Sequence, residues 1–406
     1  MPSVRYRPLL RRQLGELKLH ALALFWSVAS RDVLRILPGT SRSFGPPRRW
    51  SQWINYRQRP GVEWREVWPE GPAELPPPYF CSSDKVSFTL PPPARWPAAG
   101  VAIIPHGRIL DEHGWVVGED DTFLGDFCQL GNNPRSRVNH IFKLAPPRRL
   151  AGRTLNLCSV HAIANFYHYV VDAIGRFPLV KAAGFSWDDF DHIVLPRFQS
   201  AATVEIEQTI EVPTDRMIRM PRHEQFICDV LIQPSFPGLN ACTPPWLVNF
   251  YQTLFPAPPL PRTRRLYFAR EGTRSAVNAA DLDRRIAALG FEKVDPMKTP
   301  RLRELLGQAS HVIGVHGAAL TNLLFCQPGT RILEIMPSDV SGFTPRFYYY
   351  TLSAGGQMPY GAVIGESLKG RLLDLFPQSG SDFVVNLDDL DRGLAALLAN
   401  PGASSN

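Results

Sequence analysis

The chain has 406 residues, of which 44% are hydrophobic and 20% are charged. These values are typical of a globular protein with a substantial apolar core, and the length suits roughly two to three domains. The net charge of +7 favours an anionic ligand or surface. The basic residues come without an aromatic RNA-binding motif or zinc-finger spacing, so we expect no nucleic-acid partner.

Residues 1–50 predict a basic helical lead-in. Their most apolar stretch, Leu19–Ala29, falls short of the roughly 18 to 20 residues that cross a bilayer and lacks a signal-cleavage pattern. It is amphipathic, so peripheral membrane contact and packing on the rest of the chain both stay open. The six cysteines are scattered without a C-x-x-C motif, which is typical of reduced thiols. We expect a cytoplasmic protein, with attachment to the inner face of the membrane as the open alternative.

The positions of proline- and glycine-rich stretches predict the domain limits. Residues 51–149 combine a Pro-rich stretch with short β-type runs and predict a small antiparallel unit. Residues 150–261 predict a Rossmann-like layer of alternating strands and helices that ends in a Pro-rich crossover linker. Residues 262–400 predict a second such layer, and residues 401–406 a disordered tail.

Hydrophobic periodicity predicts the following elements in chain order. The first layer is expected to hold strands at 155–158, 192–195 and 230–232 and helices at 165–182 and 201–210. A short helix is expected in the crossover, at 245–254. The second layer is expected to hold strands at 265–269, 291–294, 311–315 and 331–336 and helices at 279–289, 301–309 and 318–325. The segment 345–361, with three consecutive tyrosines, is expected as loop or strand, and 383–398 as a strand and a helix.

The helix expected at 165–182 carries the first candidate functional residues. His168 and Asp172 stand four residues apart, on one helical face. Such a carboxylate can act as a general base itself or tune the imidazole that does. A hydrogen-bonded couple without a catalytic role is the open alternative. Asn165 precedes the helix and can cap its first turn.

The strand at 265–269 runs into a polar loop that holds Arg270 and Arg274. Two guanidinium groups at the carboxyl end of a strand suit bidentate phosphate recognition. A solvated basic turn is the alternative.

The stretch Val312–Pro337 predicts a strand, a tight turn at His316–Gly317, a helix from Ala318 and a second strand that carries Glu334. The small side chains let a phosphate approach the helix N-terminus, where unpaired N–H groups and the helix dipole face it. Ligands of open α/β sheets bind at the carboxyl ends of the strands. The pattern therefore predicts an anion site, with plain packing as the alternative.

Together these groups resemble the glycosyltransferase family 61 domain over roughly residues 95–400. The family's N-x-x-H-x-x-x-D helix and its arginine-bearing strand end match Asn165, His168, Asp172, Arg270 and Arg274. Its H-G-A-x-L-T-N turn and L-E-I strand match His316, Gly317, Ala318, Leu320, Thr321, Asn322, Leu333, Glu334 and Ile335. One departure is Ala269, where relatives often carry a small polar residue, so we expect no hydroxyl contact there.

The resemblance implies an α/β fold of the GT-B type, in which two Rossmann-like domains face a cleft, with an N-terminal helical and β-rich extension. It implies an inverting, metal-independent transfer of a sugar from a nucleotide-sugar donor to a hydroxyl of a glycan acceptor, without a cofactor. Asp172 is the expected base and His168 its alternate, and Asn165 is expected in the cleft. The expected donor-binding residues are Arg270, Arg274, His316, Gly317, Ala318, Thr321, Asn322 and Glu334, the last toward the ribose. Surface or capsular polysaccharide synthesis is the expected setting.

Two other functions stay open: a non-catalytic nucleotide- or carbohydrate-binding protein of the same fold, and a transferase that moves another group onto a glycan. Metal-ligating D-x-D patterns occur at Asp189–Asp191 and Asp281–Asp283, but neither falls at the carboxyl end of an expected strand. We therefore expect no metal ligands there.

Overall fold

The computed structural model describes residues 49–83, 95–128, 144–238, 242–256, 259–272, 275–296, 298–299, 301–338, 348–368 and 382–399. Residues 1–48 of the expected lead-in with its membrane contact, Arg274 and the tail lie outside these ranges. None of the helices within them has the length and apolar character needed to cross a bilayer.

The chain folds into two compact units, residues 1–67 with 99–236 and residues 68–98 with 237–406. Each unit carries one of the two main sheets, and the fold is mixed α/β, as expected. One sheet is mixed and the other is mainly parallel, which is consistent with two Rossmann-like units. The domain limits expected from the proline- and glycine-rich stretches stay a prediction.

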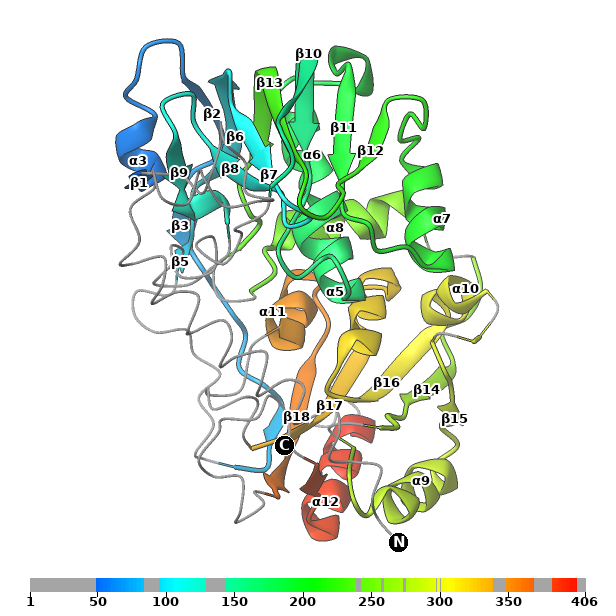
Figure 1. Ribbon diagram of the computed structural model, residues 1–406. Coiled ribbons are helices and arrows are strands. Elements are labelled where there is room, and N and C mark those ends of the chain that lie inside the picture. Colours follow the sequence, from blue (N-terminus) through cyan, green and yellow to red (C-terminus); the bar gives the residue numbers. More distant parts are fainter. Residues whose placement is uncertain are drawn as a thin grey trace, which may run out of the picture. The chain divides into compact units, whose positions relative to one another are not determined.

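The first unit is built on a ten-stranded sheet (Figure 1). Its parallel part has the order β13 (Gln225–Pro234), β10 (Arg148–Asn156), β11 (His192–Leu195) and β12 (Met217–Arg219). In its antiparallel part, β6 (Ala99–Pro105) and β7 (Arg108–Leu110) both pair with β13, and β8 (Trp115–Val117) and β9 (Thr122–Leu124) follow β7 in turn. Two outer strands complete it, β1 (Arg49–Ser51) beside β9 and β2 (Glu63–Trp68) beside β6.

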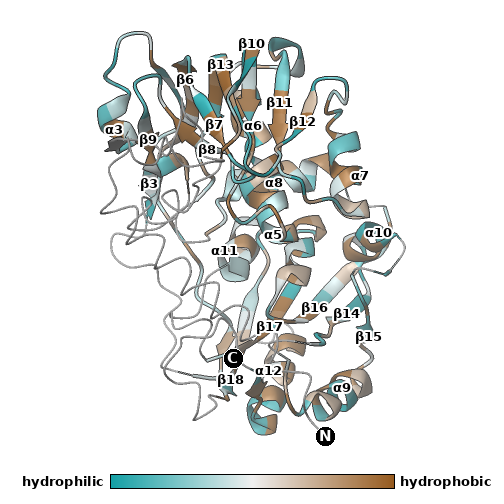
Figure 2. Ribbon diagram, viewed as in Figure 1, coloured by the Kyte–Doolittle hydropathy of each residue, from teal (hydrophilic) through white to brown (hydrophobic). Residues whose placement is uncertain are grey.

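The strands of the first unit are largely hydrophobic (Figure 2). Their buried side chains form one cluster that includes Ile104, Ile109, Leu150, Phe226 and Leu231. Because a parallel sheet buries both faces, its strands are near-continuous apolar runs. The helices of the unit are α3 (Trp53–Tyr56), the short helices of residues 166–182, and α7 (Ala201–Thr209), with 3-10 turns at η1 (Gly125–Phe127) and η4 (Trp187–Asp189).

The second unit is built on a seven-stranded sheet. Its order is β15 (Glu292–Lys293), β14 (Arg264–Phe268), β16 (Ala309–Val315), β17 (Arg331–Pro337), β18 (Tyr360–Ser367) and β19 (Phe383–Val384), with β4 (Phe80–Cys81) also beside β18. Only β19 runs antiparallel to its neighbour. Its helices are α8 (Pro245–Leu254), α9 (Ala279–Ala288), α10 (Leu302–Gly307), η5 (Ala318–Phe325), α11 (Tyr348–Gly355) and α12 (Leu387–Leu398), and a small ribbon pairs β3 (Gly71–Pro72) with β5 (Arg95–Trp96).

The prediction of a single helix at 165–182 is wrong. The segment consists of α5 (Phe166–His168), a π-helical turn η2 (Tyr169–Ala173), a 3-10 turn η3 (Ile174–Arg176) and α6 (Phe177–Ala182). Pro178 has no N–H to donate and its ring crowds the carbonyl four residues earlier, so an α-helix cannot pass through this position unbroken. The chain instead starts a new helix, in whose first turn Pro178 lies.

Two expectations for the second unit also need correction. Residues 318–325 form a 3-10 helix rather than an α-helix. The Asn322 amide donates to the carbonyl of Ala319 at 2.8 Å, and such local side-chain bonds compete with the α-helical ladder. The tyrosine-rich segment begins with a helix, α11, because burial of Tyr349 and Tyr350 overrides the β-preference of their side chains.

Candidate active site

Asn165 starts the helical segment that follows the carboxyl end of β10. Its backbone is extended, and its side-chain oxygen accepts hydrogen bonds from the N–H groups of Tyr167 at 2.9 Å and His168 at 3.4 Å. These bonds satisfy two of the donors that a helix N-terminus leaves unpaired. Asn165 therefore fixes where the segment with the candidate catalytic residues begins.

His168 and Asp172 form a close pair within this segment. The imidazole Nδ1 lies 2.5 Å from Asp172 Oδ2, and the two side chains are 15% and 11% exposed. When Nδ1 carries the proton and donates it to the carboxylate, the ring's lone pair lies on Nε2. The pair thus has the arrangement of a general base oriented by a carboxylate.

Arg176 is a buried cation that the sequence did not single out. Its guanidinium donates to the carbonyl oxygens of Cys158 at 2.7 Å and Pro234 at 3.1 Å. Burial lowers the pKa of Arg176 to about 10, against the opposing attraction of Cys158 and Asp172, so it stays charged near neutral pH. Its position four residues after Asp172 was the available signal. The charge of Asp172 in turn attracts the Arg176 guanidinium.

In the second unit, His316 follows the carboxyl end of β16 and pairs with Glu334 on β17. Nδ1 of His316 lies 2.6 Å from Glu334 Oε1, and Tyr360 donates to Oε2 at 2.6 Å. All three residues are buried. Burial, and to a smaller extent the charge of the neighbouring Glu334, raises the pKa of Tyr360 well above its usual value. Tyr360 therefore remains a hydrogen-bond donor.

Sequence reasoning missed Tyr360. Strand pairing places Tyr360 opposite Ile332, so its side chain shares a sheet face with Glu334, two residues further along β17. Both carboxylate oxygens of Glu334 therefore bond within the protein. The expected contact of Glu334 with a ribose stays a prediction, and the geometry gives Glu334 a direct influence on His316.

Gly317 makes room for Arg270. The guanidinium Nη1 of Arg270 donates to the carbonyl of His316 at 3.1 Å, and a Cβ on Gly317 would lie 1.8 Å from that nitrogen. The φ angle of Gly317 is 161°, an extended value open to any residue. Glycine is therefore required here by the close approach of a side chain, not by the backbone.

The other residues of the turn lie at different depths. Ala318 begins η5 and is half-buried, whereas Thr321 and Asn322 are buried. The Thr321 hydroxyl has no hydrogen-bond partner in the part of the chain that the structure describes. Whether these three residues contact a donor stays a prediction.

A pocket of about 250 Å³ lies beside Arg270, at the carboxyl end of β14 and the start of α9. Alanines 269, 276, 279 and 280 form part of its wall, and its charged groups are Arg270, Glu271, Asp283 and Lys293. Ala269, the departure from the family pattern, thus faces open space. Small side chains with charges of both signs suit a polar ligand that carries anionic groups and N–H or O–H donors.

The D-x-D aspartates have structural partners. Asp189 caps η4 through Ser186, and Asp191 accepts from the N–H of Arg153 at 2.8 Å. Asp281 pairs with Arg284 at 2.9 Å and Asp283 with Lys293 at 2.7 Å. Each of these four carboxylates therefore has a hydrogen-bond or ion-pair partner within the protein.

Among the described residues, Asp111, Glu112 and His113 form a group whose possible ligand atoms lie within 4.8 Å of one another. Asp111 accepts from the N–H of His223 at 2.6 Å, and Glu112 lies 3.5 Å from Arg222. Both carboxylates are therefore engaged by protein donors in the turn between β7 and β8.

Comparison with known proteins shows which family part of this chain is similar to. Residues 166–333 match the family model described as Glycosyltransferase 61. The match spans His168, Asp172, Arg270 and the turn of residues 316–322, and it ends one residue before Glu334. The chain is also 29% identical over 92 residues to "Xylan glycosyltransferase MUCI21" of Arabidopsis thaliana. That alignment covers 21% of this chain and 19% of the relative, so the chain spans about a fifth of the curated relative that it matches. Residues 166–333 of this chain are therefore similar to the glycosyltransferase family 61 domain.

Proposed function

We propose that this protein is an inverting glycosyltransferase that moves a sugar from a nucleotide-sugar donor to a hydroxyl of a glycan acceptor. The observation that carries the proposal is the part-buried His168–Asp172 pair, which lies inside the family match. We also propose the expected GT-B type of fold on the strength of the family resemblance.

The second unit supplies the donor site in this proposal. The transfer leaves negative charge on the diphosphate as its bond to the sugar breaks. Arg270 and the N–H groups at the start of η5 are fixed donors that can stabilise this charge, the task that a metal ion performs in other transferases. Arg274 comes four residues after Arg270 in the sequence, and we assign it the same task. The pocket beside Arg270 is large enough for part of the nucleotide.

His316 is suited to contact the leaving group. Glu334 engages its Nδ1, so Nε2 is the ring nitrogen available for a ligand contact, as a donor when the imidazole is protonated. In this proposal Glu334 and Tyr360 hold His316 in place.

The first unit supplies the base. The acceptor hydroxyl gives its proton to Nε2 of His168 while its oxygen bonds to the anomeric carbon of the donor sugar. The bond from that carbon to the diphosphate breaks, and its electrons go to the diphosphate oxygen. Asp172 stabilises the imidazolium that forms. The geometry thus favours the imidazole over Asp172, the base expected from the sequence.

The acceptor and the cellular setting are proposed from the plant relative and from the sequence. Because that relative is named a xylan glycosyltransferase, xylan-type oligosaccharides are the first acceptors to assay. The proposed role in surface or capsular polysaccharide synthesis, and the proposed cytoplasmic location with or without peripheral membrane contact, rest on sequence composition and the family resemblance.

Thermal unfolding with UDP, GDP, CDP and ADP tests the donor site first. A ligand that binds only the native state stabilises it by about 2.7 kcal/mol at 100 times its Kd. We expect one nucleotide to raise the Tm, and this rise to be lost in Arg270→Ala. Matching nucleotide sugars are then incubated with xylo-oligosaccharides, and NMR of the product reports the anomeric configuration. Stabilisation without transfer to any acceptor would favour the non-catalytic alternative, and retention of configuration would contradict an inverting mechanism.

A further inference from the structure

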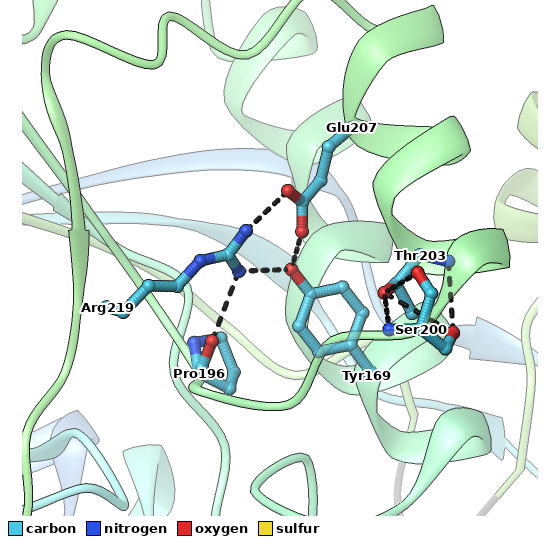
Figure 3. Close-up of polar contacts among 6 residues, drawn as sticks. All are labelled: Tyr169, Pro196, Ser200, Thr203, Glu207 and Arg219. Carbon is cyan, nitrogen blue, oxygen red and sulfur yellow. Dashed lines mark hydrogen bonds and ion pairs between the residues drawn. The ribbon is translucent and has the colours of Figure 1, made fainter.

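Three polar side chains meet next to the His168–Asp172 pair without belonging to it. They are Tyr169, Glu207 and Arg219, from η2, α7 and β12 (Figure 3). Tyr169 and Glu207 are buried, and the Arg219 side chain is 21% exposed. Because burying charged groups is costly, such a cluster calls for an explanation beyond stability.

The cluster is closed by hydrogen bonds (Figure 3). Tyr169 donates its hydroxyl proton to Glu207 Oε1, and Arg219 Nη2 donates to Glu207 Oε2 at 2.5 Å. Arg219 Nη1 donates to the Tyr169 oxygen at 2.8 Å and to the carbonyl of Pro196 at 3.2 Å. Burial, then the charge of Glu207, raises the pKa of Tyr169, so the phenol keeps its proton. The tyrosine oxygen is thus held by one acceptor and one donor.

Tyr169 is the first residue of the π-helical turn, directly after His168 and three residues before Asp172. Single π-helical turns are rare, and they persist where the surrounding structure holds them. The Tyr169 side chain extends from this turn to α7 and β12, where its hydroxyl is anchored. A rotation of the turn would separate Nδ1 of His168 from Oδ2 of Asp172, now 2.5 Å apart.

We propose that Tyr169, Glu207 and Arg219 are positioning residues: they hold the π-helical turn so that Asp172 orients the His168 imidazole. The inference rests on the proposed function, since it assigns His168 and Asp172 the role of the base. None of the three residues contacts substrate in this proposal. They act through the His168–Asp172 pair alone.

The test compares Tyr169→Phe, Glu207→Gln and Glu207→Ala with Ser200→Ala. Ser200 caps the same helix, α7, through the N–H of Thr203, and neither residue bonds to the cluster (Figure 3). Loss of this cap destabilises α7 by about 1 kcal/mol without touching Tyr169. It therefore controls for a general loss of stability.

Two readouts are measured in full-length protein. The first is the proton NMR signal of Nδ1–H of His168, identified by its loss in His168→Ala. The second is kcat and the donor KM. We expect Tyr169→Phe to shift or broaden the signal and to lower kcat about 10- to 100-fold, with KM within about twofold, because small misplacements of a catalytic group cost this much. Glu207→Gln, which keeps an acceptor for Tyr169, should retain more activity than Glu207→Ala. Ser200→Ala should change neither readout.

The inference is overturned if Tyr169→Phe and Glu207→Ala match Ser200→Ala in both readouts. If Tyr169→Phe does not fold, the comparison of Glu207→Gln with Glu207→Ala decides by the same two measurements. Failure of the proposed function has a different signature: His168→Ala and Asp172→Asn would then turn over like the parent, while the NMR signal would still respond to Tyr169→Phe.

Discussion

Replacing Gly317 by alanine tests whether Arg270 must occupy its observed place. The new Cβ would lie 1.8 Å from Arg270 Nη1 and 3.1 Å from Cζ. Non-bonded heavy atoms need about 3.5 Å, so Nη1 must retreat by roughly 1.7 Å. The backbone at residue 317 is extended and accepts alanine, and the obstacle is the end of a flexible side chain. The variant should therefore fold, with Arg270 displaced.

The magnitude follows from what the displaced group does. The bond from Arg270 to the carbonyl of His316, 3.1 Å long, is lost, which costs about 1 kcal/mol of stability. A fixed electrostatic donor to a developing anion is worth about 2 to 4 kcal/mol in the transition state. The value of kcat/KM for the donor should therefore fall roughly 30- to 800-fold.

The assay is a double-mutant cycle in kcat/KM with Gly317→Ala, Arg270→Ala and the double variant, each checked by urea unfolding. If Gly317→Ala acts by moving Arg270, the double variant should match Arg270→Ala alone. Gly71→Ala is the matched control, because its Cβ would approach no atom more closely than the carbonyl of Pro69, at 4.0 Å. Additive effects in the cycle, or a Gly317→Ala variant with parental kcat/KM, would refute the reasoning.

The other predictions concern the base, the metal and pH. His168→Ala and Asp172→Asn should each lower kcat about 10²–10⁴-fold with nucleotide affinity unchanged, and additive losses in the double variant would contradict a pair that acts as a unit. Turnover should survive EDTA; loss on chelation that Mg²⁺ or Mn²⁺ restores would disprove metal independence. Burial, and to a smaller extent the charges of Arg265 and Arg331, lowers the pKa of His311 below its usual 6.5. His311 therefore binds a proton more readily in the unfolded chain than in the folded protein. The free energy of unfolding of the parent protein should therefore fall as pH drops through 6.5, and it should fall less steeply in His311→Gln. Parallel curves of unfolding free energy against pH for the parent and the variant would contradict this prediction.

The sequence alone predicted the elements whose signal is local. The strand at 192–195 and the helix at 245–254 have the expected bounds, because a short apolar run and a proline-led amphipathic stretch each carry their own periodicity. The spacing of His168 and Asp172 likewise predicted that their side chains meet. The expected turn at His316–Gly317, between a strand and a helix, is also present, with a 3-10 helix in place of an α-helix.

Other features arose only from contacts between distant segments. Pairing of β4 with β18 joins residues near 80 to residues near 361, and no pattern within either segment specifies that partner. The bond from Tyr360 to Glu334 depends on strand register, and the contacts of Tyr169 with Glu207 and Arg219 depend on the packing of three elements. Periodicity spans a few residues, whereas these contacts are selected by burial and by the need to pair buried polar groups. The sequence therefore supplied candidate functional residues, and the tertiary structure decided what each of them bonds to.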